Sequence, residues 1–254
     1  MTHYTVVGKS DIGNSRNINQ DSLLIKHILY GDTEILMAII CDGMGGLSKG
    51  EWASATIIRK FDEWFESNIS YEVENLDLKV ISHKWILTLK NLNLKIQEYS
   101  KQFNLRIGST FTGALFIGNQ YIIVHIGDTR VYHIGKSIKQ LTKDHTLVAR
   151  EVEKGILTYD QAQFDKHQNI LSQCIGASVT INPQVIYGES EKGYYLLCSD
   201  GLRHKIDETE MINLINYKRL LNKKQMSKKM NQMIEIVKSR GEKDNISMIL
   251  IKFF

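Results

Sequence analysis

The chain has 254 residues, of which 43% are hydrophobic and 24% charged, and its formal net charge is +4. A chain of this length can bury a full core without disulfide or metal staples, and the composition is ordinary for a soluble globular protein. The charge is too small to argue for nucleic-acid binding, and no apolar run approaches the ~20 residues of a membrane span. The length suits one large domain or two small ones, and we expect the protein to bind neither nucleic acid nor membrane.

The first part of the chain changes from a strand-like to a helix-like pattern. Three strands are predicted, at Tyr4–Gly8, Ser22–Leu29 and Ile35–Cys41, with a hairpin turn at Gly31-Asp32. Apolar residues then recur every three or four positions. This spacing predicts two amphipathic helices that dock on a sheet, one over Gly50–Phe65 and one with its stripe from Ile81 to Phe103.

Strands return in the second half, interrupted by shorter helices. The predicted strands are Ser109–Phe116, Gln120–Ile126, Arg130–Ile134, Val185–Tyr187, Tyr194–Cys198 and Ile246–Phe253. The predicted helices are His145–Lys154, Glu208–Asn216 and Met226–Ser239. Between them, Gly155–Ser172 is polar and irregular, which is typical of a flap.

The order of these elements indicates the fold class. Hairpin-linked strands imply antiparallel sheets, and the helices arrive in pairs instead of alternating with single strands. This order disfavours a doubly wound parallel fold. We predict an α+β fold: a four-layer α-β-β-α sandwich of two stacked antiparallel sheets flanked by helix pairs.

The cysteines and the chain start favour a cytoplasmic protein. Cys41, Cys174 and Cys198 match no zinc or disulfide spacing. They are expected to be small buried hydrophobes in a reducing cytosol, with a redox switch as the alternative. The first residues lack the basic and apolar regions of a signal peptide. A basic cluster is interpreted either as a solvated helix face or as a patch for acidic partners: Lys218, Arg219, Lys223, Lys224, Lys228 and Lys229.

Five short stretches place an aspartate beside glycine or asparagine, and three of them follow an apolar run that looks like a buried strand. A carboxylate that leaves a buried strand is costly unless it is paired or bound to metal. Oxygen ligands without a histidine cluster favour Mg²⁺ or Mn²⁺ over zinc. The set predicts metal-dependent chemistry, and its aspartates are Asp21, Asp42, Asp128, Asp200 and Asp244.

The sharpest motif is Asp42-Gly43-Met44-Gly45-Gly46. Its glycines let the backbone approach an ion closely, so that Asp42 can bridge two cations and the Gly43 carbonyl can add an oxygen ligand. No Gly-Lys-Ser/Thr ending follows, which disfavours a nucleotide-binding loop. The regularly spaced oxygen ligands of a calcium-binding EF-hand loop are missing too.

Arg16 lies five residues before Asp21. An arginine beside a metal centre suits a phosphate substrate, because its guanidinium fork binds two phosphate oxygens at once. The alternative is a surface arginine paired with a carboxylate.

These motifs together resemble one family. The sequence is similar to bacterial metal-dependent serine/threonine protein phosphatases, the protein phosphatase 2C-like (PPM) family, and the similarity runs in family order over nearly the whole chain. The matching stretches are Gly13–Asp21, Cys41–Gly46, Gly108–Thr110, His125–Tyr132, Leu141–His145, Cys198–Leu202 and Asp244–Ile246. The resemblance implies a single catalytic domain over residues 1–254, built as a sandwich of two antiparallel sheets flanked by helix pairs, in agreement with the fold predicted above.

The resemblance also implies a metal-binding role for each aspartate. Asp42 would bridge two core Mn²⁺ or Mg²⁺ ions, with the Gly43 carbonyl on one of them. Asp200 and Asp244 would hold the other ion. Asp21 would act mainly through metal-bound water.

Three further roles follow from the same resemblance. Asp128 would help to hold a third, weaker ion together with Asp200. Arg16 would bind the substrate phosphate, and Asn245 would orient Asp244. A water activated by the two core ions would attack phosphorus in line, so no phosphoenzyme and no nucleophilic cysteine are expected. The catalytic group is therefore Asp42, Asp200 and Arg16.

The expected substrates are proteins phosphorylated on serine or threonine, including a cognate Ser/Thr kinase or its substrates, and the expected state is a monomer. A regulatory phosphatase that acts on one phosphorylated switch protein would share this chemistry. A catalytically inactive binding module is the alternative from another class. Inactive copies usually lose metal aspartates, whereas all five are present here.

Overall fold

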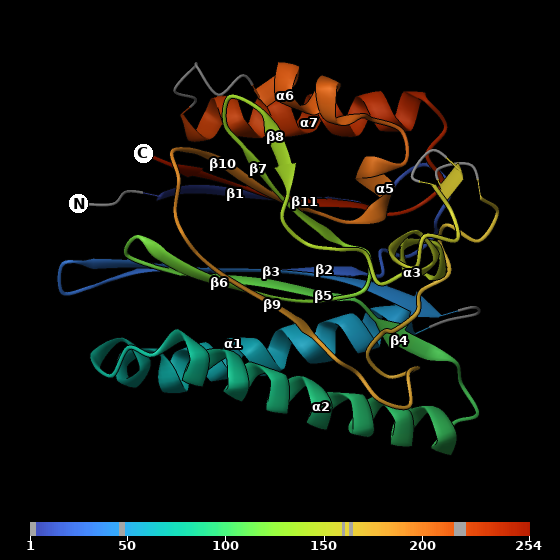
Figure 1. The fold of residues 1–254 in the computed structure, drawn as a ribbon, viewed down its shortest axis with the longest axis horizontal. Coiled ribbons are helices and arrows are strands. Elements are labelled where there is room, and N and C mark those ends of the chain that lie inside the picture. The colour runs from blue at the N-terminus through green and yellow to red at the C-terminus, as the bar shows by residue number, and fades with distance from the viewer. Residues whose placement is uncertain (1–3, 46–48, 159–160, 163–164, 216–221) are drawn as a thin grey trace.

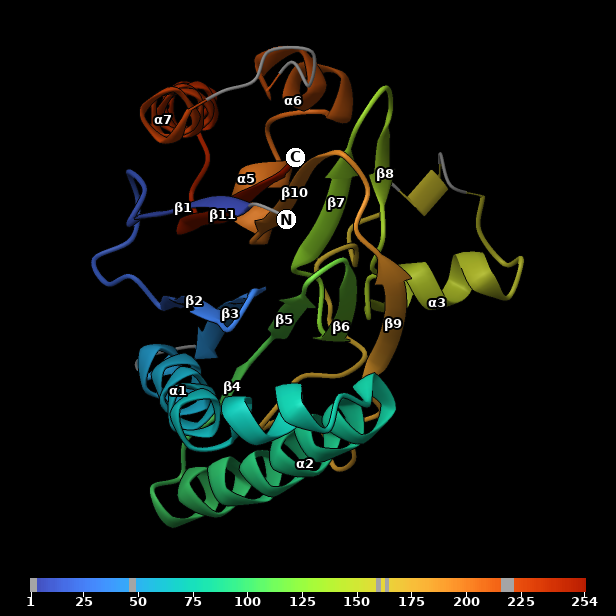
Figure 2. The same cartoon turned by 90° about the vertical axis from the view of Figure 1, so that its left-hand side faces the viewer.

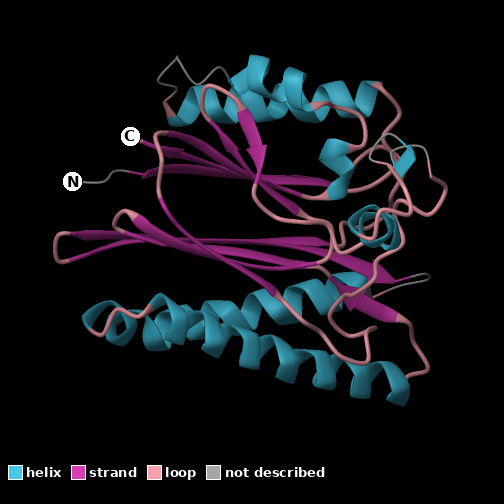
Figure 3. Ribbon diagram, viewed as in Figure 1, coloured by secondary structure: helices cyan, strands magenta, loops and turns pink. Residues whose placement is uncertain are grey.

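Two antiparallel sheets lie face to face, and helices cover their outer faces (Figures 1 and 3). The computed structural model describes residues 4–45, 49–158, 161–162, 165–215 and 222–254. The first sheet has the strand order β1-β11-β10-β7-β8, and the second has β2-β3-β5-β6-β9 with β4 paired to β3. The strands of the first sheet are β1 (Tyr4–Asp11), β11 (Ile246–Phe253), β10 (Gly193–Cys198), β7 (Arg130–Ile134) and β8 (Ile138–Gln140). Those of the second are β2 (Asp21–Tyr30), β3 (Thr33–Gly45), β4 (Ile107–Ser109), β5 (Phe111–Ile117), β6 (Gln120–Ile126) and β9 (Gln184–Glu189).

Each sheet carries a pair of helices on its outer face. The long helices α1 (Gly50–Glu74) and α2 (Leu78–Gln102) cover the second sheet, and α6 (Glu208–Ile215) and α7 (Lys223–Ser239) cover the first (Figures 1 and 2). Two short helices, α3 (Leu147–Glu153) and α5 (Asp200–Arg203), lie toward one end of the sandwich. The four-layer α-β-β-α arrangement predicted from the sequence is confirmed.

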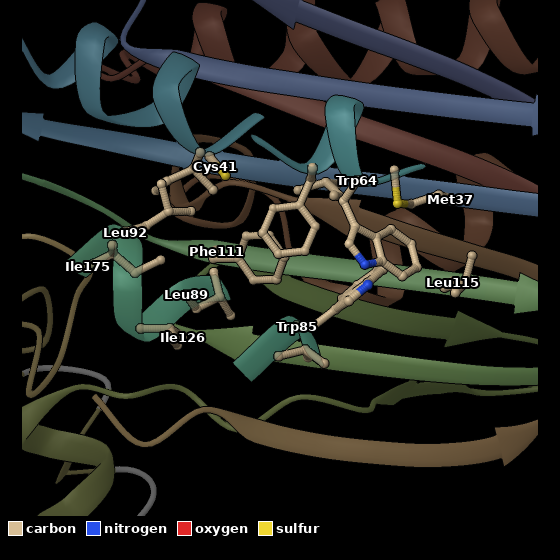
Figure 4. Close-up of a cluster of buried hydrophobic side chains, with 14 of the residues drawn as sticks. Met37, Cys41, Trp64, Trp85, Leu89, Leu92, Phe111, Leu115, Ile126 and Ile175 are labelled. Carbon is tan, nitrogen blue, oxygen red and sulfur yellow. The ribbon is translucent and has the colours of Figure 1, made fainter. Parts of the chain in front are cut away.

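The apolar stripes of the helices form the outer parts of the core. On α2, Trp85 and Leu89 are fully buried against the sheet (Figure 4). The Trp85 ring packs edge-on against Phe61 of α1, with ring centroids 5.0 Å apart. A separate buried cluster lies under α6 and α7, and a third fills the space between the sheets. Burial of these stripes is the main stabilisation of the helices, since tertiary packing outweighs intrinsic helix propensity.

Several elements differ from the prediction, each for a local reason. Helix α1 continues beyond Phe65 to Glu74, because Ile69 carries its buried stripe one turn further. Helix α3 begins after His145, where the Thr146 hydroxyl accepts a hydrogen bond from the Ala149 amide as N-cap.

One helix was missed and one predicted strand is divided. Helix α5 has four residues, too few for a period to show. Strand β8 pairs with β7, as expected of a hairpin that turns at Gly135-Lys136. The predicted strand Ser109–Phe116 is interrupted at Thr110 between β4 and β5.

Part of the predictions falls outside the described residues: Met1 to His3 at the chain start, Gly46 of the glycine motif, parts of the flap, Asn216, and Lys218 and Arg219 of the basic cluster. The other lysines of that cluster lie on α7, where Lys223, Lys224 and Lys228 are exposed, as expected of a solvated helix face. None of the helices in the described ranges combines the length and apolar character that crossing a membrane requires.

The three cysteines are free and buried. Burial raises the pKa of the Cys198 thiol to about 12 and that of Cys41 well above its usual value, so neither forms a thiolate readily. This agrees with their prediction as small buried hydrophobes.

Candidate metal centre

The predicted aspartates lie at strand ends. Asp21 begins β2, and its Cα pairs with that of Asp42 on β3. Asp200 follows β10 at the start of α5, Asp244 comes shortly before β11, and Asp128 follows β6. Because β2 pairs with β3 and β10 with β11, residues distant in sequence are brought to neighbouring strand ends.

Electrostatics shows that these carboxylates share one field. Burial, reinforced by the charges of Asp21 and Asp200, raises the pKa of Asp42 well above its usual value. Burial raises the pKa of Asp21 to about 7, and the charge of Asp200 adds to the effect against hydrogen bonds from Ser247 and Ser199. Within the described ranges no three His, Cys, Asp or Glu side chains are close enough to form a ready ligand cage. The charges of the carboxylates therefore act on one another, although the side chains do not form a complete set of metal ligands in this arrangement.

Asp200 has an incomplete set of partners. Its Oδ1 atom is buried and has no hydrogen-bond partner in the described part of the chain. Its Oδ2 atom lies 3.6 Å from Nε2 of His204. A buried carboxylate oxygen without a partner is costly, and a cation would satisfy it. The site thus fits a hard divalent ion by both its donor atoms and its excess of negative charge.

Glycine at position 43 is required by the close approach of the backbone. A Cβ atom there would overlap the carbonyl oxygens of Gly50 and Gln20, and the Gly43 amide donates a hydrogen bond to the Gln20 oxygen at 3.1 Å. The preceding Asp42 is fixed by Thr110, whose hydroxyl accepts from the Asp42 amide at 2.8 Å and whose amide donates to the Asp42 carbonyl at 2.9 Å. Asp42 is therefore held by its backbone, and its carboxylate takes no part in these contacts.

Arg16 contacts a predicted metal ligand. Its Nε and Nη2 atoms bind the two carboxylate oxygens of Asp244 at 3.1 and 2.8 Å. The side chains are 49% and 32% exposed. Arg16 thus lies at the candidate metal centre. In this structure it forms an ion pair with Asp244, which is the alternative to phosphate binding considered from the sequence.

Asn245 ties the loop that carries Arg16 to the start of β11. Its side-chain amide donates to the carbonyl oxygens of Ile12 and Ile18 at 2.9 and 3.2 Å, and its Oδ1 accepts from the Gln20 amide at 2.9 Å. It reaches Asp244 through its backbone, whose N–H donates to Asp244 Oδ1 at 2.8 Å. Sequence reasoning expected Asn245 to act on Asp244 and missed its link to this loop.

A cation from the chain itself contacts Asp128. Nη2 of Arg203 lies 2.8 Å from Asp128 Oδ2, and both side chains are nearly buried. Burial and the charge of Asp200 raise the pKa of Asp128 to about 6, while Arg203 lowers it. Arg203 was missed from the sequence; its position one helical turn after Asp200 was the available signal.

A buried polar network fixes the turn before Asp128. His125 Nε2 donates to the Lys143 carbonyl at 3.0 Å, so its Nδ1 accepts from the Thr112 hydroxyl at 2.8 Å. Burial lowers the pKa of His125 to about 3, which agrees with a neutral ring. Gly127 takes a positive φ of 109°, a conformation that suits glycine.

Two further groups near Asp200 were not found from the sequence. Nδ1 of His204 lies 3.6 Å from a carboxylate oxygen of Glu242. Burial opposes ionisation of Glu242, but His204 and the amides of Asp244 and Lys243 lower its pKa to about 2. Glu242 thereby holds the backbone of Asp244, since its Oε1 accepts from that amide at 3.0 Å.

The chain is similar in sequence to known protein phosphatases. A serine/threonine phosphatase, stp, of Listeria monocytogenes is 29% identical over 251 residues, which are 96% of this chain and 94% of the relative. Protein phosphatase PhpP of Streptococcus pneumoniae is 30% identical over 249 residues, 95% of this chain and 94% of that protein.

Solved structures of protein phosphatases have the same fold as this chain. The S. agalactiae serine/threonine phosphatase superposes with a TM-score of 0.85 at 26% identity, over 98% of this chain and 99% of that one. The catalytic domain of PstP, solved in complex with 2 manganese ions, shares the fold with a TM-score of 0.80 at 24% identity, over 100% and 99% of the two chains. The family model described as protein phosphatase 2C matches residues 7–250. The chain therefore belongs to the protein phosphatase 2C family and is a serine/threonine protein phosphatase.

Proposed function

We propose that the chain hydrolyses phosphoserine and phosphothreonine in proteins at the carboxylate centre, with Mn²⁺ or Mg²⁺ as its cofactor. The observation that carries this proposal is the buried, unpartnered Asp200 oxygen within the field of Asp21 and Asp42. When bound, two divalent ions would lower the pKa of water and supply a nucleophile near neutral pH.

The chain's own residues divide the work of holding these ions. Asp42, Asp200 and Asp244 supply carboxylate oxygens, and Gly43 adds its carbonyl oxygen. Asp21 acts through water, which suits a side chain whose Oδ2 already accepts from the Ser199 hydroxyl at 3.1 Å. The third, weaker ion at Asp128 that the family resemblance implies is not needed for this proposal.

Arg16 changes partner in this proposal. Asp244 turns its carboxylate to an ion, and the guanidinium is left with two donors directed toward the centre. Because both side chains are partly exposed, the exchange leaves no buried charge without a partner. The fork then binds two oxygens of the substrate phosphate and offsets the charge that develops on them during displacement.

The proposed partners are proteins phosphorylated on serine or threonine, including a cognate kinase or its substrates. A monomeric enzyme of the cytoplasm is proposed with them, and three free buried cysteines suit a reducing compartment. A restricted role on one phosphorylated switch protein would use the same centre, and a screen of phosphopeptides separates the two.

The test is hydrolysis of a phosphothreonine peptide by the full chain with Mn²⁺, after demetallation, and by the variants Asp42→Asn and Asp200→Asn. Activity should vanish on demetallation, return with Mn²⁺, and fall at least about 100-fold in both variants, the range for loss of a major electrostatic group. Asp32→Asn, in the exposed turn between β2 and β3, is the matched control and should keep full activity. Full activity in the demetallated chain would contradict the proposal.

A further inference from the structure

We propose that the guanidinium of Arg203 takes the place of a third metal ion at Asp128, so that the centre binds two divalent ions and no more. This inference rests on the proposed function, since it concerns how many ions that function uses.

Arg203 contacts Asp128 directly. Arg203 Nη2 and Asp128 Oδ2 are 2.8 Å apart, and the two side chains are 13% and 6% exposed. Arg203 belongs to α5, the same short helix that begins with Asp200. A third ion would have to bind both Asp200 and Asp128. The Arg203 guanidinium already connects the helix that carries Asp200 to Asp128.

The charges around this pair are already balanced. The nearest other carboxylate is Asp144, 3.9 Å from Arg203 Nη2. Arg130 already neutralises Asp144, because its Nε and Nη2 atoms bind the two oxygens of Asp144 at 2.8 and 2.7 Å. Two arginines thus offset two aspartates. Asp128 needs no further cation, in contrast to Asp200, whose Oδ1 has no partner among the described residues.

An ion bound at Asp128 would leave Arg203 without its carboxylate partner. Displacing Arg203 would strand a nearly buried guanidinium, and breaking a buried pair is strongly unfavourable. Its Nε atom already has no acceptor in the described part of the chain, so Asp128 is its closest carboxylate anchor. Arg16 differs, because its 49% exposed side chain can turn to solvent when Asp244 takes an ion. Of the two arginines that contact predicted metal ligands, Arg16 can therefore release its carboxylate and Arg203 cannot.

The position of Asp128 leaves it little freedom to seek another partner. Its residue is 4% exposed, and the preceding Gly127 donates its amide to His145 Nδ1 at 3.2 Å and accepts from the His145 amide at 2.7 Å. The turn is fixed before any ion arrives, with its carboxylate already on Arg203. Arg203 is in this sense a positioning residue for the centre.

Calorimetric titration of the demetallated full chain with Mn²⁺ tests the inference, because it counts sites independently of activity. The unsubstituted chain and Asp128→Asn should both show two sites with the same affinities. Arg203→Met exposes the Asp128 charge and should gain one weaker site. The double variant Arg203→Met/Asp128→Asn should lose that site again. Arg203→Lys keeps a cation and should stay at two.

Arg240→Met is the matched control. Arg240 also pairs with a carboxylate, Glu210, with Nη2 to Oε1 at 2.6 Å, but on the exposed side of α6 and α7. Its removal should leave two sites.

A third site in the unsubstituted chain that disappears in Asp128→Asn would overturn the inference while leaving the proposed function intact. An unchanged count in folded Arg203→Met would overturn it as well. If Arg203→Met does not fold, as judged by thermal unfolding, the comparison of the unsubstituted chain with Asp128→Asn decides. Absence of any Mn²⁺ binding by the unsubstituted chain would instead contradict the proposed function, and this inference with it.

Discussion

Asp21 and Asp42 face each other across the antiparallel pairing of β2 with β3. Burial raises the pKa of both carboxyl groups, and nearby charges add to it: those of Asp21 and Asp200 at Asp42, and that of Asp200 at Asp21. The pair therefore costs folding energy in the metal-free chain at neutral pH. Divalent ions reverse this cost, so the centre couples metal binding to stability.

The first prediction concerns Asp21→Asn in the metal-free chain. The folded-state pKa of Asp21 is about 7, above its ordinary value of 3.8. The free energy of unfolding of the unsubstituted chain therefore falls as pH rises from 3.8 to about 7, because the folded state resists ionisation of Asp21. The variant should gain stability relative to the unsubstituted chain between pH 5 and pH 8. We expect the melting temperature to rise by at least about 2–4 °C at pH 8, the effect of ~1 kcal/mol in a chain of this size.

Thermal unfolding at pH 5 and pH 8, with and without Mn²⁺, checks this. With Mn²⁺ the order should reverse, because the variant weakens the ion site. Equal differences at both pH values in the metal-free chain would rule out a titrating Asp21.

The second prediction concerns Arg16→Ala. Loss of the guanidinium group should lower kcat/KM for a phosphothreonine peptide by about 10- to 100-fold, since hydrogen bonds to charged groups contribute ~1.5–3 kcal/mol. Steady-state kinetics at saturating Mn²⁺ gives the value. Arg59→Ala, on the exposed face of α1, is the control and should leave kcat/KM unchanged. An unaltered kcat/KM in Arg16→Ala would leave the arginine as a partner of Asp244 alone.

Sequence reasoning succeeded where the signal was local. The apolar stripes predicted the helices that cover the sheets. The motifs with aspartate beside glycine or asparagine indicate Asp42, Asp200 and Asp244, whose roles as metal ligands stay predictions. It failed where a role depends on a distant partner. Arg203 acts on Asp128, 75 residues away, and the amide of Asn245 reaches Ile12, 233 residues away. No period or motif encodes such contacts, because they form only when elements distant in sequence come together, as β1 and β11 do within one sheet.

Gly43→Ala is the third prediction. The new methyl group would overlap the carbonyl oxygens of Gly50 and Gln20, so the chain must move at the point where the Gly43 oxygen is proposed to face an ion. Mn²⁺ affinity, measured by calorimetry, should fall by at least about 10-fold, which corresponds to 1.4 kcal/mol. The control is Gly31→Asn in the open turn between β2 and β3, where a Cβ meets nothing within 4 Å and asparagine tolerates the positive φ. Retained affinity in Gly43→Ala would remove this carbonyl from the centre.

The fourth prediction concerns His125→Gln, which tests the network that fixes the turn before Asp128. The folded-state pKa of His125 is about 3, below its ordinary value of 6.5, so the stability that the neutral ring contributes is present above pH 6.5 and is lost as pH falls toward 3. Glutamine does not titrate. At pH 8 the variant should be less stable by about 1–3 kcal/mol, the cost of disturbed buried hydrogen bonds.

At pH 5 the difference should shrink by up to ~2 kcal/mol, because each pH unit below 6.5 costs the unsubstituted chain up to about 1.4 kcal/mol. Urea unfolding of the metal-free chains at both pH values measures it. His167→Gln, on a side chain 49% exposed, is the control and should shift neither midpoint. A difference in stability that stays constant from pH 8 to pH 5 would show that His125 takes a proton in the folded chain, and the neutral ring could then not be what holds the Asp128 turn.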